Sequence, residues 1–146
     1  MALPKPEPGL VISFSYLWRD EHRRGRDEGC KDRPCVLLAV EARSATSIPG
    51  SNIVTVVPIT HSPPTQSEGA IELPPRVKAA LGLDDQRSWV IVEEANRFVW
   101  PGFDLRPISG KRKFDYGLLP PRLHDRLVAG FLAAAARQKL AIVPRD

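Results

Sequence analysis

RPCVLLAV, at residues 33–40, contains six consecutive apolar residues from Cys35 to Val40. Such a run is typical of a strand that is buried on both faces, whereas a strand with one face in water alternates apolar and polar residues. Glu28 lies five residues before Arg33, and a second strand-like run ends at Thr60. We expect the guanidinium at the start of the first strand, the upstream carboxylate and the hydroxyl at the end of the next strand to meet at one site.

The pattern around this run is mainly β. Apolar segments of strand length are separated by turn residues such as Pro8-Gly9, Gly50-Ser51-Asn52 and Pro63-Pro64. Short strands with frequent turn signals favour a small barrel over alternating strands and helices. The predicted strands cover residues 10–14, 34–41, 53–59, 70–73 and 89–92, and the last can continue to residue 98. The polar segment 18–32 is predicted to be a long loop.

Two helices are expected in addition to the strands. Pro74-Pro75 precedes a short helix over 76–81 that Gly82 ends, and residues 103–119 are expected to be irregular. Residues 121–139 carry apolar side chains at helical spacing, so this helix is predicted to pack on the barrel. The stripe consists of Leu123, Leu127, Val128, Phe131, Leu132 and Ala135.

Length and composition favour a single domain over residues 1–146. The chain has a mass of 16.2 kDa, and 42% of its residues are hydrophobic. Its longest apolar stretch, 127–136, is about half of the roughly 20 residues that a membrane-spanning helix needs. The N-terminal segment lacks the layout of a signal peptide, so we expect a cytoplasmic protein.

The two cysteines, Cys30 and Cys35, give little support for a metal site or a disulfide. Zinc needs about four ligands, and no further cysteine or histidine cluster accompanies them. Cys35 is predicted to be a core residue and Cys30 a loop thiol. We expect no metal and no cofactor.

Positive charge is concentrated near the C-terminus. The formal net charge is +4, and residues 106–145 contain nine Lys/Arg and two Asp/Glu. This distribution suits a polyanionic partner such as a nucleic acid, and a solvated basic surface explains it equally well.

The order of several motifs resembles that of the MazF/PemK family of toxin endoribonucleases. The resemblance rests on Pro6-Glu7-Pro8-Gly9 before a first strand, on Glu28 and Arg33-Pro34, and on Pro58-Ile59-Thr60. Gly82-Leu83, followed by a strand with Glu94 and Asn96, also fits the family layout. The arginine-rich first loop and His61, where serine or threonine is more usual, depart from it.

The resemblance implies an SH3-like β-barrel with a C-terminal helix. It also implies a homodimer that cleaves single-stranded RNA at short sequences and is silenced by a cognate antitoxin. The family pattern places the catalytic arginine at Arg33, the active-site hydroxyl at Thr60 and a loop glutamate at Glu28.

These residues suit RNA cleavage in which the substrate 2′-hydroxyl is the nucleophile and no metal takes part. Arg33 can hold two phosphate oxygens, and Thr60 can donate to the charge that develops on phosphorus. Glu28 can act as a base if burial moves its pKa toward neutrality. His61 is a further candidate, because imidazole exchanges protons near neutral pH.

Each role has a simpler alternative. Arg33 could have no role beyond a surface ion pair with Asp32 or Glu28, and Thr60 could be an ordinary hydroxyl at a strand end. Residues 19–33 contain six basic and five acidic residues, so Glu28 could belong to a solvated ion-pair network.

RNA contacts are predicted from aromatic and basic side chains near this site. Trp18 can stack on a base, because single strands are commonly bound through aromatic rings. The candidate RNA-binding residues are Trp18, Arg19, Arg24, Arg26, Glu94 and Asn96. A polar face of an edge strand explains Glu94 and Asn96 equally well.

Two non-catalytic functions compete with the nuclease hypothesis. One is a toxin of the same fold that binds a protein target such as a topoisomerase, as the related CcdB family does. The other is a nucleic-acid-binding module, which the basic C-terminal third and the aromatic residues favour.

Overall fold

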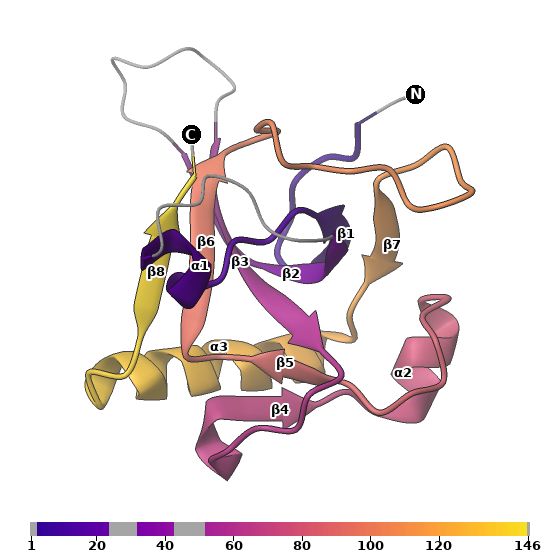
Figure 1. The fold of residues 1–146 in the computed structure, drawn as a ribbon. Coiled ribbons are helices and arrows are strands. Elements are labelled where there is room, and N and C mark those ends of the chain that lie inside the picture. Colours follow the sequence, from indigo (N-terminus) through magenta and orange to yellow (C-terminus); the bar gives the residue numbers. More distant parts are fainter. Residues whose placement is uncertain (1–2, 24–31, 43–51, 146) are drawn as a thin grey trace.

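A computed structural model describes residues 3–23, 32–42 and 52–145 (Figure 1). The strands are β1 (Leu10–Phe14), β2 (Arg33–Ala42), β3 (Asn52–Thr60), β4 (Ala70–Glu72), β5 (Trp89–Ile91), β6 (Glu94–Val99), β7 (Asp115–Leu118) and β8 (Ala141–Pro144). The helices are α1 (Arg19–Arg23), α2 (Pro75–Ala80) and α3 (Pro121–Ala136), with a 3₁₀ turn, η1 (Ser67–Gly69), before β4. Within these residues, no helix has the length and apolar character that crossing a membrane requires.

The strands form a mainly antiparallel sheet in the order β4-β5-β3-β2-β1-β7. β3 pairs with β2 along one edge, while its other edge pairs first with β6 and then with β5. β8 extends the sheet as a parallel neighbour of β6, and the two lie side by side in Figure 1. The predicted mainly β fold with a terminal helix is confirmed.

The expected closure into a barrel is wrong. β5 and β6 share the outer edge of β3 and lead to different neighbours, so the sheet ends at β4 and β8 on that side. On the other side it ends at β7, and within the described residues no pairing joins β7 to β4 or β8.

The middle of β2, from Cys35 to Leu38, is buried on both faces, as its apolar sequence predicted, whereas Ala39 and Val40 are only partly buried. Val36 and Leu38 belong to one hydrophobic cluster, and Cys35 and Leu37 belong to a second cluster on the opposite face. Cys35 is fully buried, which confirms its prediction as a core residue, and burial raises the pKa of its thiol well above the ordinary value. Cys30 lies outside the described residues.

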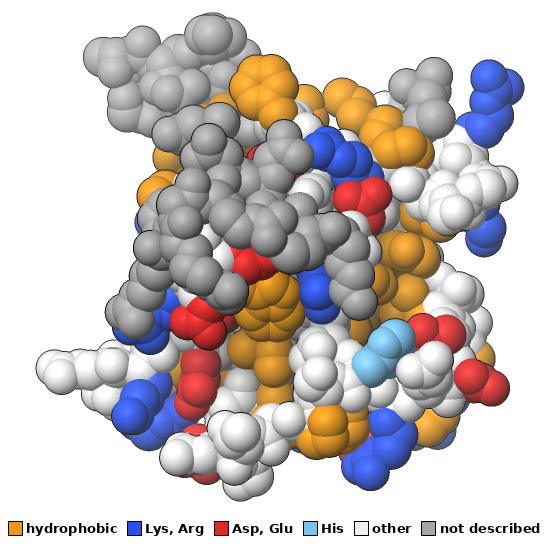
Figure 2. Space-filling model, viewed as in Figure 1, with side chains coloured by type: hydrophobic (Ala, Val, Ile, Leu, Met, Phe, Trp, Pro, Cys, Tyr) orange, Lys and Arg blue, Asp and Glu red, His pale blue; other side chains and the backbone are white. Residues whose placement is uncertain are grey.

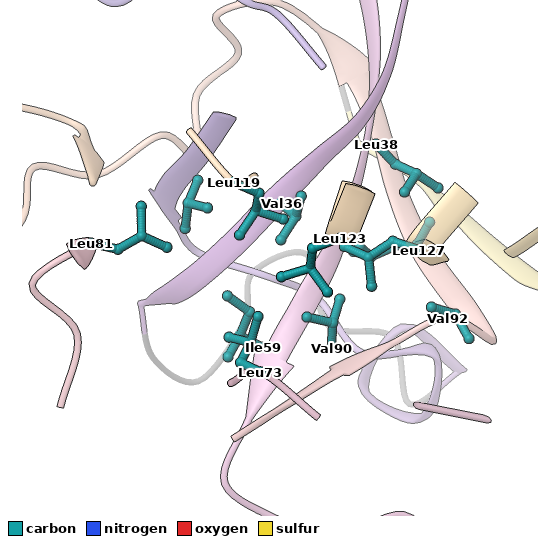
Figure 3. Close-up of a cluster of buried hydrophobic side chains, with 13 residues drawn as sticks. Val36, Leu38, Ile59, Leu73, Leu81, Val90, Val92, Leu119, Leu123 and Leu127 are labelled. Carbon is teal, nitrogen blue, oxygen red and sulfur yellow. The ribbon is translucent and has the colours of Figure 1, made fainter. Parts of the chain in front are cut away.

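The first cluster lies between the sheet and α3. Leu123 and Leu127 of α3 gather with Val36 of β2 and Val90 of β5 (Figure 3). The predicted stripe is correct for these leucines and for the partly buried Val128 and Phe131. It is wrong for Leu132 and Ala135, which are exposed, because the buried face passes through Ala134 instead.

Several boundaries differ from the prediction. The fifth strand is two strands, β5 and β6, which both pair with β3 but have β4 and β8, respectively, as their second neighbours. β7 interrupts the segment expected to be irregular, β8 follows the last expected helix, and α1 occupies part of the predicted loop. The Glu21 carboxylate accepts a hydrogen bond from the Trp18 backbone N–H at 3.1 Å, which supports the start of α1 in the manner of half a capping box.

A buried polar network joins β6 to the segment after β1. The Asn96 side chain accepts from the Leu17 N–H at 2.9 Å and donates to the Leu17 carbonyl at 2.8 Å. Arg145 donates to Asn96 Oδ1 at 3.2 Å and to the Ser15 carbonyl at 3.1 Å, and pairs with Asp104 at 2.9 Å. Because both Asn96 and Arg145 are buried, each of these bonds satisfies a group that water does not reach.

We expect Asn96→Ala to lower the free energy of unfolding by about 2–4 kcal/mol, because it leaves the buried Leu17 N–H and carbonyl without partners. Denaturant unfolding at neutral pH measures this loss. Gln66→Ala, which removes an exposed amide with no capping hydrogen bond, is the control and should change stability little. A loss below 1 kcal/mol in Asn96→Ala, on the order of the control, would contradict the role given to the network.

Candidate functional site

A hollow lies where the start of β2, the end of β3 and the loop after α2 come together. Its volume is about 540 Å³. We call it the Arg33 pocket, and its lining includes Trp18, Arg33, Thr60, His61, Lys78 and Asp84. On the face of the molecule shown in Figure 2, basic, acidic, histidine and hydrophobic side chains lie close together.

The antiparallel pairing of β2 and β3 brings two of the predicted residues together. Cys35 pairs with Pro58, and continuing this register by two residues places Arg33 opposite Thr60. On its other edge Arg33 pairs with Phe14 of β1. The positions of Arg33 and Thr60 are therefore fixed by strand pairings in the interior of the sheet.

Arg33 presents a guanidinium beside an aromatic ring. Its Cζ atom lies 4.9 Å from the ring centre of Trp18, a cation–π distance. Its Nε atom is buried, and it has no hydrogen-bond partner among the described residues. An unpaired buried donor is unusual in a stable fold, so it points to a role for this residue other than stability.

The simpler explanation for Arg33, an ion pair with Asp32, is not what the structure shows. Asp32 instead lies 3.9 Å from the Nε atom of Arg106. The alternative pair with Glu28 concerns a residue outside the described part of the chain.

Thr60 is the last residue of β3. Its Oγ1 atom accepts a hydrogen bond from the Ser62 backbone N–H at 3.2 Å. No described residue accepts the hydroxyl proton, so this group can donate to a ligand in the pocket.

His61 is part of a chain of three ionisable side chains. Its Nε2 atom lies 2.8 Å from Asp84 Oδ2, and Asp84 Oδ1 lies 2.7 Å from Lys78 Nζ. The hydrogen bond from Lys78 is the main reason that the pKa of Asp84 is lowered. The Lys78 side chain is only 5% exposed and also donates to Ser88 Oγ at 2.6 Å and to the Gln86 carbonyl.

Three predicted RNA contacts do not line the Arg33 pocket. Arg19 lines a separate hollow beside β8, and its backbone N–H donates to Glu94 Oε1 at 3.1 Å. Glu94 also accepts from the Tyr16 hydroxyl at 3.0 Å. Asn96 is 0% exposed and hydrogen-bonded to Leu17 and Arg145 within the fold, so the prediction that it contacts RNA is wrong.

Three further predicted residues, Glu28, Arg24 and Arg26, lie outside the described residues. Their predicted roles as a base and as phosphate contacts therefore stay predictions.

Sequence reasoning missed Lys78 and Asp84. Lys78 lies in a helix of six residues, and Asp84 lies in the polar stretch Asp84-Asp85-Gln86-Arg87, where solvated charges are expected. One signal was present, because Val77-Lys78-Ala79 places a lysine inside an otherwise apolar segment.

Comparison with protein-family models, with curated proteins and with solved structures gave no match for this chain. Within the described part of the chain, no three His, Cys, Asp or Glu side chains are grouped as they would be to hold a metal ion.

We expect Glu94→Gln to change how stability depends on pH. Burial raises the pKa of Glu94, so its contribution to stability is present at low pH and is lost as the pH rises through that raised value. Glutamine keeps an acceptor for Tyr16 and Arg19 without the buried charge. Denaturant unfolding at several pH values between 4 and 7 should show the wild type losing stability relative to the variant as the pH rises. Parallel curves for the two proteins would refute this role of Glu94.

Proposed function

We propose that this protein is a metal-independent endoribonuclease that cleaves single-stranded RNA through the substrate 2′-hydroxyl. The observation that carries the proposal is that Arg33, Thr60 and His61 line one pocket although they come from different strands or strand ends. The pocket volume of about 540 Å³ is within the range of small-ligand sites, roughly 300–1,000 Å³.

The side chains in the pocket match the needs of a phosphodiester. An always-charged guanidinium forks onto two phosphate oxygens, so Arg33 suits the bound phosphate and the additional charge that develops in the transition state. The Thr60 hydroxyl can donate to the same charge, because its proton has no acceptor among the described residues. His61 supplies an imidazole, which can accept a proton from a hydroxyl or donate one.

Trp18 and the distribution of charge support a nucleic acid as the substrate. The Trp18 ring lies against Arg33 and lines the pocket, so a base adjacent to the bound phosphate can stack near it. The basic segment 106–145 favours a polyanion, and binding should weaken as salt rises.

The proposal includes the properties that the MazF/PemK resemblance implies. We infer a toxin of a toxin–antitoxin system that works in the cytoplasm as a homodimer and is inhibited by a cognate antitoxin. The open sheet with β1, β2, β3 and α3 would then be a variant of the SH3-like barrel of that family, with edges left unpaired at β4, β7 and β8.

We expect purified protein to cut a mixed-sequence, single-stranded transcript in excess chelator. The products should carry a 2′,3′-cyclic phosphate, or its opened form, and a 5′-hydroxyl. Arg33→Ala should lower the cleavage rate by about 10²–10³-fold, the usual cost of removing one group that stabilises transition-state charge. Gel electrophoresis and mass spectrometry of the fragments measure both results.

Arg87→Ala is the matched control. Its guanidinium also lies over a tryptophan, 5.0 Å from the Trp89 ring, but it lies outside the Arg33 pocket. It should cleave at the wild-type rate. Salt-sensitive RNA binding without cleavage would favour the nucleic-acid-binding module, and growth inhibition with RNA left intact would favour a toxin that binds a protein such as a topoisomerase.

A further inference from the structure

We propose that Asp84 is the positioning residue that makes His61 the general base of this cleavage, with Lys78 holding Asp84 in place. The inference rests on the proposed function, and it adds a specific atom for proton transfer and two residues that set its geometry.

The His61–Asp84 contact fixes which ring nitrogen carries hydrogen. A carboxylate only accepts, so the contact of 2.8 Å from Asp84 Oδ2 requires the hydrogen to be on Nε2. In a neutral imidazole the other nitrogen, Nδ1, is then a proton acceptor. No described residue hydrogen-bonds to Nδ1, so this atom is available to a substrate hydroxyl.

Asp84 is held far more firmly than its exposure suggests. Its side chain is 46% exposed, yet Oδ1 accepts from Lys78 Nζ at 2.7 Å and from the Gln86 N–H at 3.1 Å. These bonds leave Oδ2 directed to His61. Lys78 is itself fixed by Ser88 and the Gln86 carbonyl, so the buried ammonium anchors the carboxylate.

The charged groups around His61 come from two walls of the pocket. Asp84 and Lys78 lie on the wall formed by α2 and its following loop, and Arg33 and Asp32 lie on the wall at the start of β2. The Asp84 carboxylate can stabilise the positive charge of the imidazolium, while Arg33 binds the phosphate. Proton transfer is therefore assigned to His61, and stabilisation of the charge on the phosphate is assigned to Arg33.

The 2′-hydroxyl gives its proton to His61 Nδ1, and its oxygen forms a bond to phosphorus. The bond between phosphorus and the 5′-oxygen breaks, and that oxygen takes a proton from water. The hydroxide that remains combines with the proton that the His61 imidazolium releases, so the imidazole returns to its neutral form. The products are a 2′,3′-cyclic phosphate and a 5′-hydroxyl, and Asp84 remains a carboxylate throughout.

Kinetics on a short oligoribonucleotide that contains a mapped cleavage site test the inference. His61→Gln should lower the rate by about 10²-fold. Asp84→Asn should lower it by at least about tenfold, because its amide can donate to Nε2 and favour the opposite tautomer, which in serine proteases is costly. The double variant should be no slower than His61→Gln alone, because the two side chains act as one unit.

Asp85→Asn is the matched control, because Asp85 is the exposed neighbouring carboxylate and does not line the Arg33 pocket. It should keep the wild-type rate, and thermal melting should confirm that all variants are folded. Two outcomes would overturn this inference and leave the nuclease proposal intact. One is cleavage that depends on Arg33 but is not slowed by Asp84→Asn. The other is a double variant that cleaves more slowly than His61→Gln alone. Absence of any cleavage by the wild type would overturn both.

A second measurement needs no RNA. Long-range ¹H–¹⁵N spectra of the wild-type protein above the imidazole titration should show His61 protonated on Nε2, with assignment by loss of its signals in His61→Gln. Asp84→Asn should shift the ring toward the Nδ1-protonated form. A wild-type ring already protonated on Nδ1 would refute the geometry whatever the cleavage assay shows.

Discussion

The antiparallel register between β2 and β3 is the constraint on which the site depends. These strands share the centre of the sheet, and their pairing sets Arg33 against Thr60 at one end. Since β2 is apolar on both faces, alternation alone does not penalise a one-residue slip as it does in a half-exposed strand. The irregularity between Leu37 and Ala39 and the polar residues at the strand ends are the features that distinguish this register from its neighbours.

The sequence was informative wherever structure depends on neighbours along the chain. Continuous apolar runs located β1, β2 and β3, and helical spacing located α3. β7 and β8 were missed because their pairing is set by distant partners: β8 lies beside β6 in parallel, and β7 beside β1. Closure of the sheet likewise depends on whether its edge strands, which are far apart in sequence, pair with each other. Local sequence patterns do not contain that information.

The same contrast between local and distant partners explains which residues of the candidate site could be predicted. Arg33, Thr60 and His61 could be predicted to converge because consecutive strands pair, and they line one pocket. Asn96 was misassigned because its partners, Leu17 and Arg145, are remote in sequence, so a buried polar residue looked like a surface one. Lys78 and Asp84 were overlooked because charged residues near a helix end are usually solvated, whereas here three acceptors surround a buried ammonium.

The two walls of the pocket differ in how the chain builds them. Arg33 and Thr60 are brought together across the sheet, but Lys78 of α2 and its partners Asp84, Gln86 and Ser88 belong to one short stretch of sequence, 78–88, that ends just before β5. The hydrogen bonds of the Lys78 ammonium all end on residues of that stretch, whereas Leu81 ties the stretch to the core. Divergence or engineering could therefore exchange Lys78, Asp84 and Ser88 together, with Leu81 kept, and alter one half of the chemistry while the strands that carry the other half stay in place.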